Sequence, residues 1–149
     1  MTSASRMHEA AVQEKVSQVS VRVFLVEDMV HMQGIVTDLL AGVGDFRLAS
    51  TSATEAEAKL WLSEHPGAWD LAVIDLVLDQ GSGMGVLSDA HRSAREHGGK
   101  IVVFSDYASD GIRDHCLRLG ADAVFLKSQT HEFMNYCSAL GGLEAAATP

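Results

Sequence analysis

Short apolar runs alternate along the chain with longer stretches in which apolar residues recur at helical spacing. The apolar runs are rich in β-branched and aliphatic residues and predict buried strands at 21–26, 46–50, 69–74, 101–104 and 123–126. The stretches between and after them predict helices at about 29–40, 52–65, 84–96, 109–119 and 130–140. This alternation predicts an α/β fold: a (βα)5 doubly wound, parallel five-stranded sheet in a single domain.

Turn and cap residues separate these elements. Pro66 ends the second helix, and Ser52 and Glu55 have capping-box spacing before it. Gly120 lies where a left-handed residue ends a helix, and Thr130 is in position to cap the last one. We expect residues 1–20 to be a mobile N-terminal extension or one loosely docked helix, 21–140 to be the folded domain, and 141–149 to be a frayed tail.

Composition and charge exclude several classes of function. The 149 residues carry a formal net charge of −9, which argues against binding to nucleic acid or to anionic lipid. No apolar run is long enough to span a membrane, and no apolar core follows Arg6 as in a secretory signal, so we expect a cytoplasmic protein. Cys116 and Cys137 lack CxxC spacing and are expected to be reduced and buried.

Chemically active side chains follow four of the five predicted strands. They are Glu27 and Asp28 after the first, Asp75 after the third, Ser105 after the fourth and Lys127 after the fifth. The carboxyl ends of parallel strands share one edge of a sheet, where open α/β sheets bind ligands. Each of these residues alone is as well explained as a cap or a surface charge, but together they predict a site.

The residue types in this site favour phosphoryl transfer. Three carboxylates brought together repel, so they predict either a hard divalent metal or a protonated acid. Magnesium fits best, because it binds few protein carboxylates and accepts phosphate oxygens. Asp75 is then the carboxylate nucleophile, and Ser105 and Lys127 bind phosphoryl oxygens.

The same residues carry a family resemblance over about 21–140. The sequence resembles the receiver domains of two-component response regulators, in particular the stand-alone regulators of chemotaxis. The resemblance rests on the acidic pair, on Asp75 followed by Ser82-Gly83-Met84, on Ser105, and on Gly120-Ala121-Asp122 before Lys127. It implies a flavodoxin-like fold.

The resemblance also implies roles for these residues. Asp75 would accept a phosphoryl group from a histidine kinase or a histidine phosphotransfer protein. Asp28, Asp75 and the carbonyl of Val77 would bind Mg²⁺, with Glu27 acting through water. Ser105 and Lys127 would bind the new phosphoryl group and, with Asp75, carry the chemistry. Such a protein is not an enzyme in the usual sense, because it catalyses only its own phosphorylation and dephosphorylation.

Four positions depart from the family pattern. Val124 replaces an aromatic residue that rotates inward on activation, for which Phe125 or Tyr107 are possible substitutes. Ser128 replaces a proline in a cis bond, so we expect a trans Lys127–Ser128 peptide.

The other two departures, and two neighbouring positions, bear on rates. Asp106 replaces a small residue and is expected to slow phosphorylation by small donors, and Asp79 replaces a proline and is expected to loosen the loop after Asp75. Val77 and Tyr107 lie where they would shield the phosphorylated aspartate from water, which predicts a long-lived phosphorylated state.

Two functions remain open from the sequence. The first is a stand-alone receiver that signals to an unknown downstream protein, as a monomer or a weak dimer through the face formed by the helix at 109–119, the strand at 123–126 and the helix at 130–140. The second is a binding module on the same fold that acts without phosphorylation, to which Val124 and Ser128 lend weight. A metal-dependent phosphatase is less favoured, because its usual second aspartate is Val77 here.

Overall fold

The structure is a computed structural model that describes residues 20–146, with side chains described as far as residue 141. The N-terminal extension expected at 1–20 therefore lies, except for residue 20, outside the described residues. Within the described part of the chain, no helix is both long and apolar enough to cross a bilayer.

Five parallel strands form one sheet, as the alternating pattern predicts. The strands are β1 (Val21–Val26), β2 (Phe46–Ser52), β3 (Leu71–Ile74), β4 (Lys100–Ser105) and β5 (Ala123–Leu126). Their order across the sheet is β2-β1-β3-β4-β5, and every neighbouring pair is parallel. The chain thus reverses its direction of winding after β2, which leaves a crevice beyond the carboxyl ends of β1 and β3.

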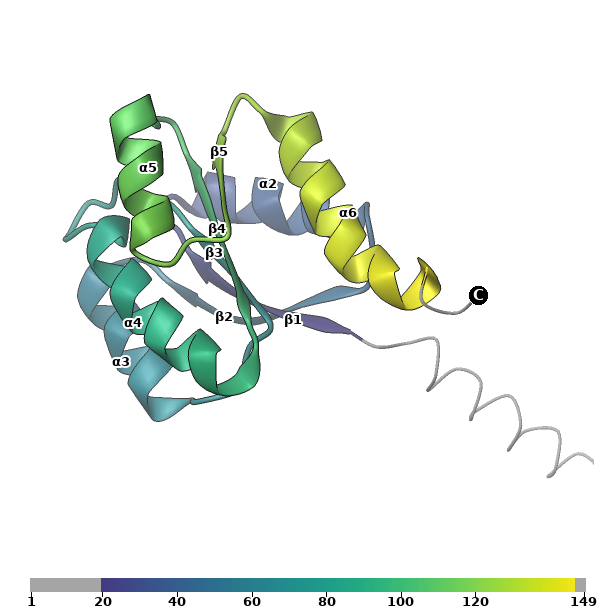
Figure 1. Ribbon diagram of the computed structural model, residues 1–149, viewed down its shortest axis with the longest axis horizontal. Helices are drawn as coiled ribbons and strands as arrows, with labels where there is room; N and C mark the ends of the chain where they lie inside the picture. The colour runs from purple at the N-terminus through teal and green to yellow at the C-terminus, as the bar shows by residue number, and fades with distance from the viewer. Residues whose placement is uncertain (1–19, 147–149) are drawn as a thin grey trace, which may run out of the picture.

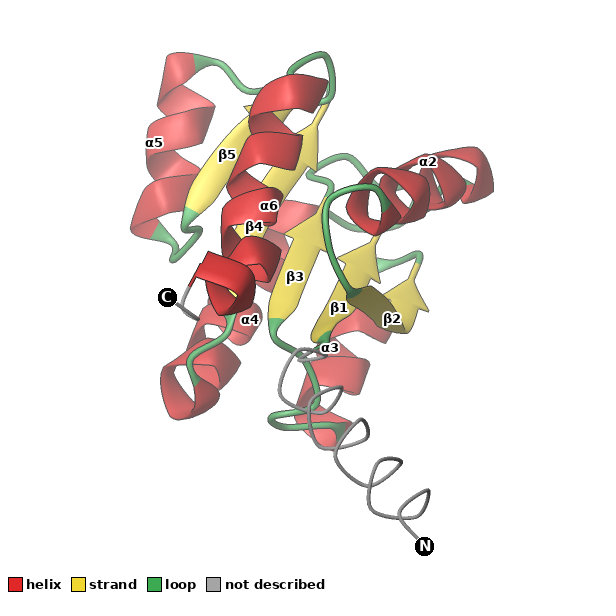
Figure 2. Ribbon diagram, turned by 90° about the vertical axis from the view of Figure 1, so that its right-hand side faces the viewer, coloured by secondary structure: helices red, strands yellow, loops and turns green. Residues whose placement is uncertain are grey.

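Five described helices cover the two faces of the sheet (Figures 1 and 2). They are α2 (Val30–Ala41), α3 (Glu55–Glu64), α4 (Gly83–His97), α5 (Asp110–Arg118) and α6 (Thr130–Ala146). Helices α3, α4 and α5 pack on one face, and α2 and α6 pack on the other. The predicted doubly wound (βα)5 fold is therefore confirmed.

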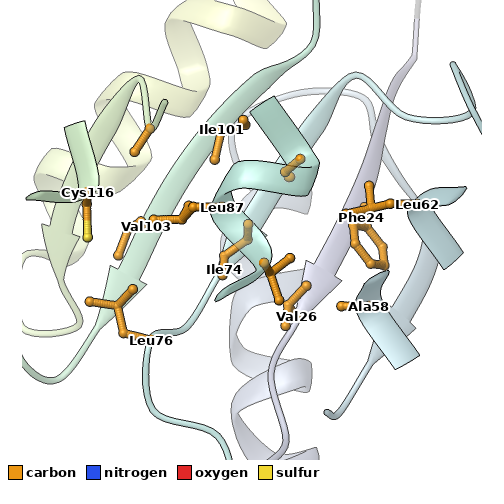
Figure 3. Packing of buried hydrophobic residues seen from close by; sticks show 14 of the residues in the cluster. Phe24, Val26, Ala58, Leu62, Ile74, Leu76, Leu87, Ile101, Val103 and Cys116 are labelled. Carbon is orange, nitrogen blue, oxygen red and sulfur yellow. The ribbon is translucent and has the colours of Figure 1, made fainter. Parts of the chain in front are cut away.

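The core lies in two layers, one on each side of the sheet. Figure 3 shows the larger layer, where Leu87 of α4 packs over Ile74 and Val103, and Ala58 and Leu62 of α3 cover Phe24. The smaller layer joins β1, β3 and β4 to α2 and α6. Cys116 belongs to the first layer and Cys137 to the second, and both are free and buried as expected.

Some element boundaries differ from the sequence expectation. β2 continues to Ser52, which is buried in the strand, so the capping box predicted from Ser52 to Glu55 was wrong. Thr54 caps α3 instead, and its hydroxyl accepts from the Glu57 N–H while the Glu57 carboxylate accepts from the N–H of residue 53. Glu55 is thereby free for another contact.

The last helix also differs. α6 runs to Ala146 rather than ending near Leu140. Thr130 is its first residue, and its hydroxyl donates to the carbonyl of Lys127 instead of capping the helix.

Candidate functional site

The register of the parallel strands brings the predicted residues to one edge of the sheet. Val26 of β1 pairs with Ile74 of β3, so Glu27 and Asp75 are the next residues on adjacent strands. The Asp75 N–H donates to the Val26 carbonyl, and the Lys127 N–H donates to the Ser105 carbonyl at 2.8 Å. The backbone thus fixes where each of these side chains begins.

The Asp75 carboxylate is buried and hydrogen-bonded at both oxygens. Its Oδ1 accepts from the Ser105 hydroxyl at 2.8 Å and from the Val77 N–H at 3.3 Å. Its Oδ2 accepts from the Lys127 ammonium at 2.9 Å. Asp75 is only 5% exposed, so these three donors replace most of the water that an isolated carboxylate would bind.

Lys127 links two buried carboxylates that are far apart in sequence. Its ammonium lies 2.8 Å from Glu27 Oε1 as well as 2.9 Å from Asp75 Oδ2. Desolvation opposes the ammonium charge, but the hydrogen bonds to Glu27 and Asp75 outweigh it and raise the pKa of Lys127. Burial also raises the pKa of Glu27, and the charge of Asp75 adds to this, while Lys127 and the Met29 N–H partly offset it.

Hydrogen bonds from the start of α2 and from the loop after Asp75 hold the acidic pair, Glu27 and Asp28, at the end of β1. The Met29 N–H donates to Glu27 Oε2, and the side-chain amide of Gln33 donates to the Glu27 carbonyl at 2.7 Å. Asp28 is held from the other side, because the Asp79 N–H donates to its Oδ2 at 2.8 Å. Proline has no N–H, so Asp79 gives the loop after Asp75 an anchor that proline would not provide, contrary to the expectation that Asp79 loosens this loop.

The donor set suits a small divalent cation. Glu27, Asp28 and Asp75 each offer one oxygen, and these oxygens lie within 4.8 Å of one another. Two oxygens bound to one Mg²⁺ ion lie about 3 to 4 Å apart, so the spacing is compatible with a shared ion. The three carboxylates face one ammonium, and a dication would balance the remaining negative charge.

Gly83 lets α4 begin directly against the end of β3. A Cβ atom on Gly83 would collide with the backbone carbonyl of Asp75. The Gly83 N–H donates to the Leu76 carbonyl at 3.0 Å. Ser82 precedes it and caps α4 by accepting from the Met84 N–H. The Ser82-Gly83-Met84 sequence therefore closes the loop that starts at Asp75.

The structure also places the residues that depart from the family pattern. Val124 is fully buried, Phe125 packs against Phe133 and Tyr136 of α6, and Tyr107 is 66% exposed. The Lys127–Ser128 peptide is trans, as expected, since the described residues contain no cis bond. The packing of Phe125 against α6 favours a structural role for this side chain.

A comparison with family models identifies the chain. The model of the response regulator receiver domain matches residues 23–136. The chain belongs to this family. A receiver domain of this type is a signalling phosphoacceptor rather than a conventional enzyme. A comparison with curated protein sequences gives no match.

Solved structures with this fold are similar over most of their length. A chain of the CheX–CheY–BeF3–Mg complex from Borrelia burgdorferi has a TM-score of 0.71 at 18% identity, covering 80% of this chain and 88% of that chain. The phosphorylated cyanobacterial phytochrome response regulator RcpA has a TM-score of 0.68 at 18% identity, covering 88% and 98%. A CheY-like receiver domain protein from Methanospirillum hungatei JF-1 has a TM-score of 0.67 at 22% identity, covering 85% and 98%.

Two contacts near the site have no counterpart in the sequence prediction. One is the hydrogen bond from the Asp79 N–H to Asp28. The donor is a backbone group, so the residue type at position 79 does not indicate this contact. The other is Glu55, which contacts the loop after Asp75 from the first turn of α3. Thr54 and Glu57 also have capping-box spacing in the sequence. If the helix cap is assigned to this pair, Glu55 has no capping role and is available for another contact.

The ion pairs of Lys127 predict a pH-dependent loss of stability in Lys127→Met. The variant leaves the Glu27 and Asp75 carboxylates buried without a cation, which is expected to cost about 3–5 kcal/mol at pH 7.5 without divalent metal. A carboxyl group whose folded-state pKa lies above its unfolded value favours the folded state as pH falls. Because the pKa of Glu27 is already raised, the loss of stability in Lys127→Met should become smaller as the pH falls toward 4.5, the usual pKa of a glutamate side chain.

Urea unfolding with EDTA between pH 5 and pH 8 measures this dependence. The control is Lys127→Met with Glu27→Gln, which removes one of the two facing charges and should recover part of the stability at pH 7.5. A deficit of the same size at every pH would show that Lys127 does not act through these carboxylates.

Proposed function

We propose that the chain is a response regulator receiver that accepts a phosphoryl group on Asp75, with Mg²⁺, from a histidine kinase or a histidine phosphotransfer protein. The observation that carries the proposal is the Asp75 carboxylate, which is buried among a hydroxyl, an ammonium and two further acids. A carboxylate in this setting suits nucleophilic attack on phosphorus, since its partners match the charges that develop there.

The transfer exchanges one bond for another. An Asp75 oxygen forms a bond to phosphorus as the phosphorus–nitrogen bond of phosphohistidine breaks, and the electron pair returns to the imidazole nitrogen. Asp75 Oδ1 already accepts two hydrogen bonds, so attack by Oδ1 requires it to release Ser105 or the Val77 N–H, whereas Oδ2 accepts only from Lys127 and keeps a second lone pair. A donor that leaves Asp75 can then donate to a phosphoryl oxygen.

A bound Mg²⁺ ion would neutralise charge on the phosphoryl oxygens. We propose Asp28, Asp75 and the carbonyl of Val77 as its protein ligands, with Glu27 acting through water. Support comes from the spacing of the three acidic oxygens and from their excess of negative charge over Lys127.

An apolar groove beside the site supports approach of a protein donor. The groove has a volume of about 420 Å³ and lies between α2 and the start of α6. Its lining includes Met29, Met32 and Ile35, and Lys127 and Asp106 also line it. Met29 is 56% exposed, so a helix of the donor can cover it and bring phosphohistidine to Asp75.

We propose the face of α5, β5 and α6 for contact with a downstream protein or a second copy. Arg113 of α5 donates to the Val124 carbonyl at 2.7 Å, so α5 is tied to β5, the strand that directly precedes Lys127. A change at Lys127 can reach this face through β5. The alternative function, a binding module that acts without phosphorylation, is supported by the buried Val124 in place of an aromatic residue.

Phosphorylation of Asp75 can be measured directly by intact mass. With acetyl phosphate and Mg²⁺, the wild-type protein should gain the mass of one phosphoryl group, and Asp75→Asn should not, because its amide is not a nucleophile for phosphorus. EDTA should abolish the gain. Asp28→Asn, which keeps the shape but removes one acid, should reduce it.

A structural response to BeF₃⁻ separates the two functions. Chemical shifts around Ser105 and Lys127 should change with BeF₃⁻ and Mg²⁺ in the wild type and not in Asp75→Asn. If neither modification nor response occurs in the wild type, the binding-module function replaces the proposal.

Asp106 is expected to slow small anionic donors. It is exposed beside Lys127 in the groove, where its charge repels acetyl phosphate. Asp106→Ala should be phosphorylated roughly 2- to 5-fold faster, and Asp106→Asn should share most of this gain if charge rather than bulk is the cause. The gain should diminish at high salt. Equal or slower rates in both variants would contradict this expectation.

Val77 and Tyr107 are expected to lengthen the lifetime of the phosphorylated state. Their side chains are 55% and 66% exposed, so they are free to cover a phosphoryl group on Asp75 from the solvent side. Loss of label from purified phosphorylated protein should be slow in the wild type and faster in Val77→Ala with Tyr107→Ala. Rapid loss from the wild type would refute the shielding role.

A further inference from the structure

Glu55, the first residue of α3, holds the loop between β3 and α4. Its Oε1 accepts from the Ser82 N–H at 2.8 Å, and its Oε2 lies 2.8 Å from the Lys59 ammonium. Its own N–H donates to the Gln80 carbonyl at 3.2 Å. One side chain thus joins a helix to a loop 27 residues further along the chain.

Two glycines leave room for this carboxylate. A Cβ atom on Gly85 would collide with Glu55 Oε2 and lie 2.7 Å from Glu55 Cδ, and its three nearest atoms all belong to Glu55. A Cβ atom on Gly81 would collide with Glu55 Cβ and lie 2.8 Å from Oε1. Gly81 also has a φ of +85°, which favours glycine for a second reason. The loop and the carboxylate therefore fit each other closely.

The held loop leads directly to the acidic site. Ser82 forms an antiparallel bridge with Val77, whose N–H donates to Asp75. Between them, the Asp79 N–H donates to Asp28 Oδ2. The segment from Val77 to Ser82 is thus fixed by Glu55 at one end and contacts two of the three site acids at the other.

We propose that Glu55 is a positioning residue that sets Asp28 and Val77 for cation binding by fixing the loop from Val77 to Ser82. The proposal rests on the proposed function of the acidic site, and it adds a residue on α3 that touches none of the site's reacting atoms. Lys59 orients the carboxylate through Oε2. The hydrogen bond from Lys59, followed by that from the Ser82 N–H, lowers the pKa of Glu55, which keeps the acceptor charged.

The first test compares Glu55→Ala and Glu55→Gln with Glu64→Ala, an exposed glutamate at the other end of α3. In metal-free protein, the Ser82 amide should exchange with solvent roughly 10-fold faster in Glu55→Ala. Glu55→Gln should restore protection, because its amide oxygen still accepts from Ser82. Glu64→Ala should match the wild type.

Mg²⁺ binding measured by calorimetry should follow the same order. Misplacing groups that orient metal ligands weakens metal binding by about 10-fold or more, so we expect roughly a 10-fold higher Kd in Glu55→Ala and a Kd near that of the wild type in Glu55→Gln. A purely structural role would lower the Tm of Glu55→Ala without changing the Kd for Mg²⁺.

Gly85→Ala gives a second, independent test. In the wild type the new methyl group should displace the Glu55 carboxylate and weaken Mg²⁺ binding as Glu55→Ala does. In the Glu55→Ala background the space is open, so Gly85→Ala should weaken binding no further. There it should raise the Tm by roughly 1–4 °C, because alanine favours the helix more than glycine.

The outcomes separate this proposal from the proposed function. If the wild type binds Mg²⁺ and is phosphorylated on Asp75, but Glu55→Ala has the same Kd and the same Ser82 exchange, the positioning role is wrong and the proposed function stands. If the wild type neither binds Mg²⁺ nor is modified, the proposed function fails, and exchange at Ser82 still reports whether Glu55 holds the loop. Additive losses from Gly85→Ala and Glu55→Ala would also overturn the positioning role.

Discussion

The central constraint of this structure is a single ammonium group between two buried carboxylates. Glu27 and Asp75 are both nearly fully buried, and Lys127 donates to each of them. Burying a charge is unfavourable unless it is paired, so each of the three side chains depends on the others. The arrangement requires β1, β3 and β5 to end at the same level, and the parallel register of the sheet provides this.

The balance of charge around Lys127 leaves the candidate site with net negative charge. The ammonium offsets one of three carboxylates, and burial, to which the charge of Asp75 adds, raises the pKa of Glu27. In the proposed function, a dication or a transferred phosphoryl group would change this balance and alter the hydrogen bonds at Asp75. Ser105 and Lys127 donate to Asp75 and would respond, and Lys127 directly follows β5, which Arg113 joins to α5.

The sequence allowed the fold and most of the site to be predicted because both follow from periodic patterns. Asp75, Ser105 and Lys127 come directly after apolar runs, and parallel strands bring such positions together whatever the loops do. Glu55 could not be predicted in the same way, because its contact with Ser82 depends on the path of an irregular loop. The anchor at Asp79 is a backbone bond, so only the absence of proline hints at it. The end of α6 was misjudged because small residues after Leu140 resemble a frayed tail.

The bond between Lys127 and Glu27 spans 100 residues of the chain. Closing so long a loop has an entropic cost, which pairing of the intervening strands reduces. The acidic site therefore takes its final shape only when β5 has joined the sheet. A cation bound at the proposed site would select completely folded molecules, and its binding free energy would stabilise the whole domain rather than one loop.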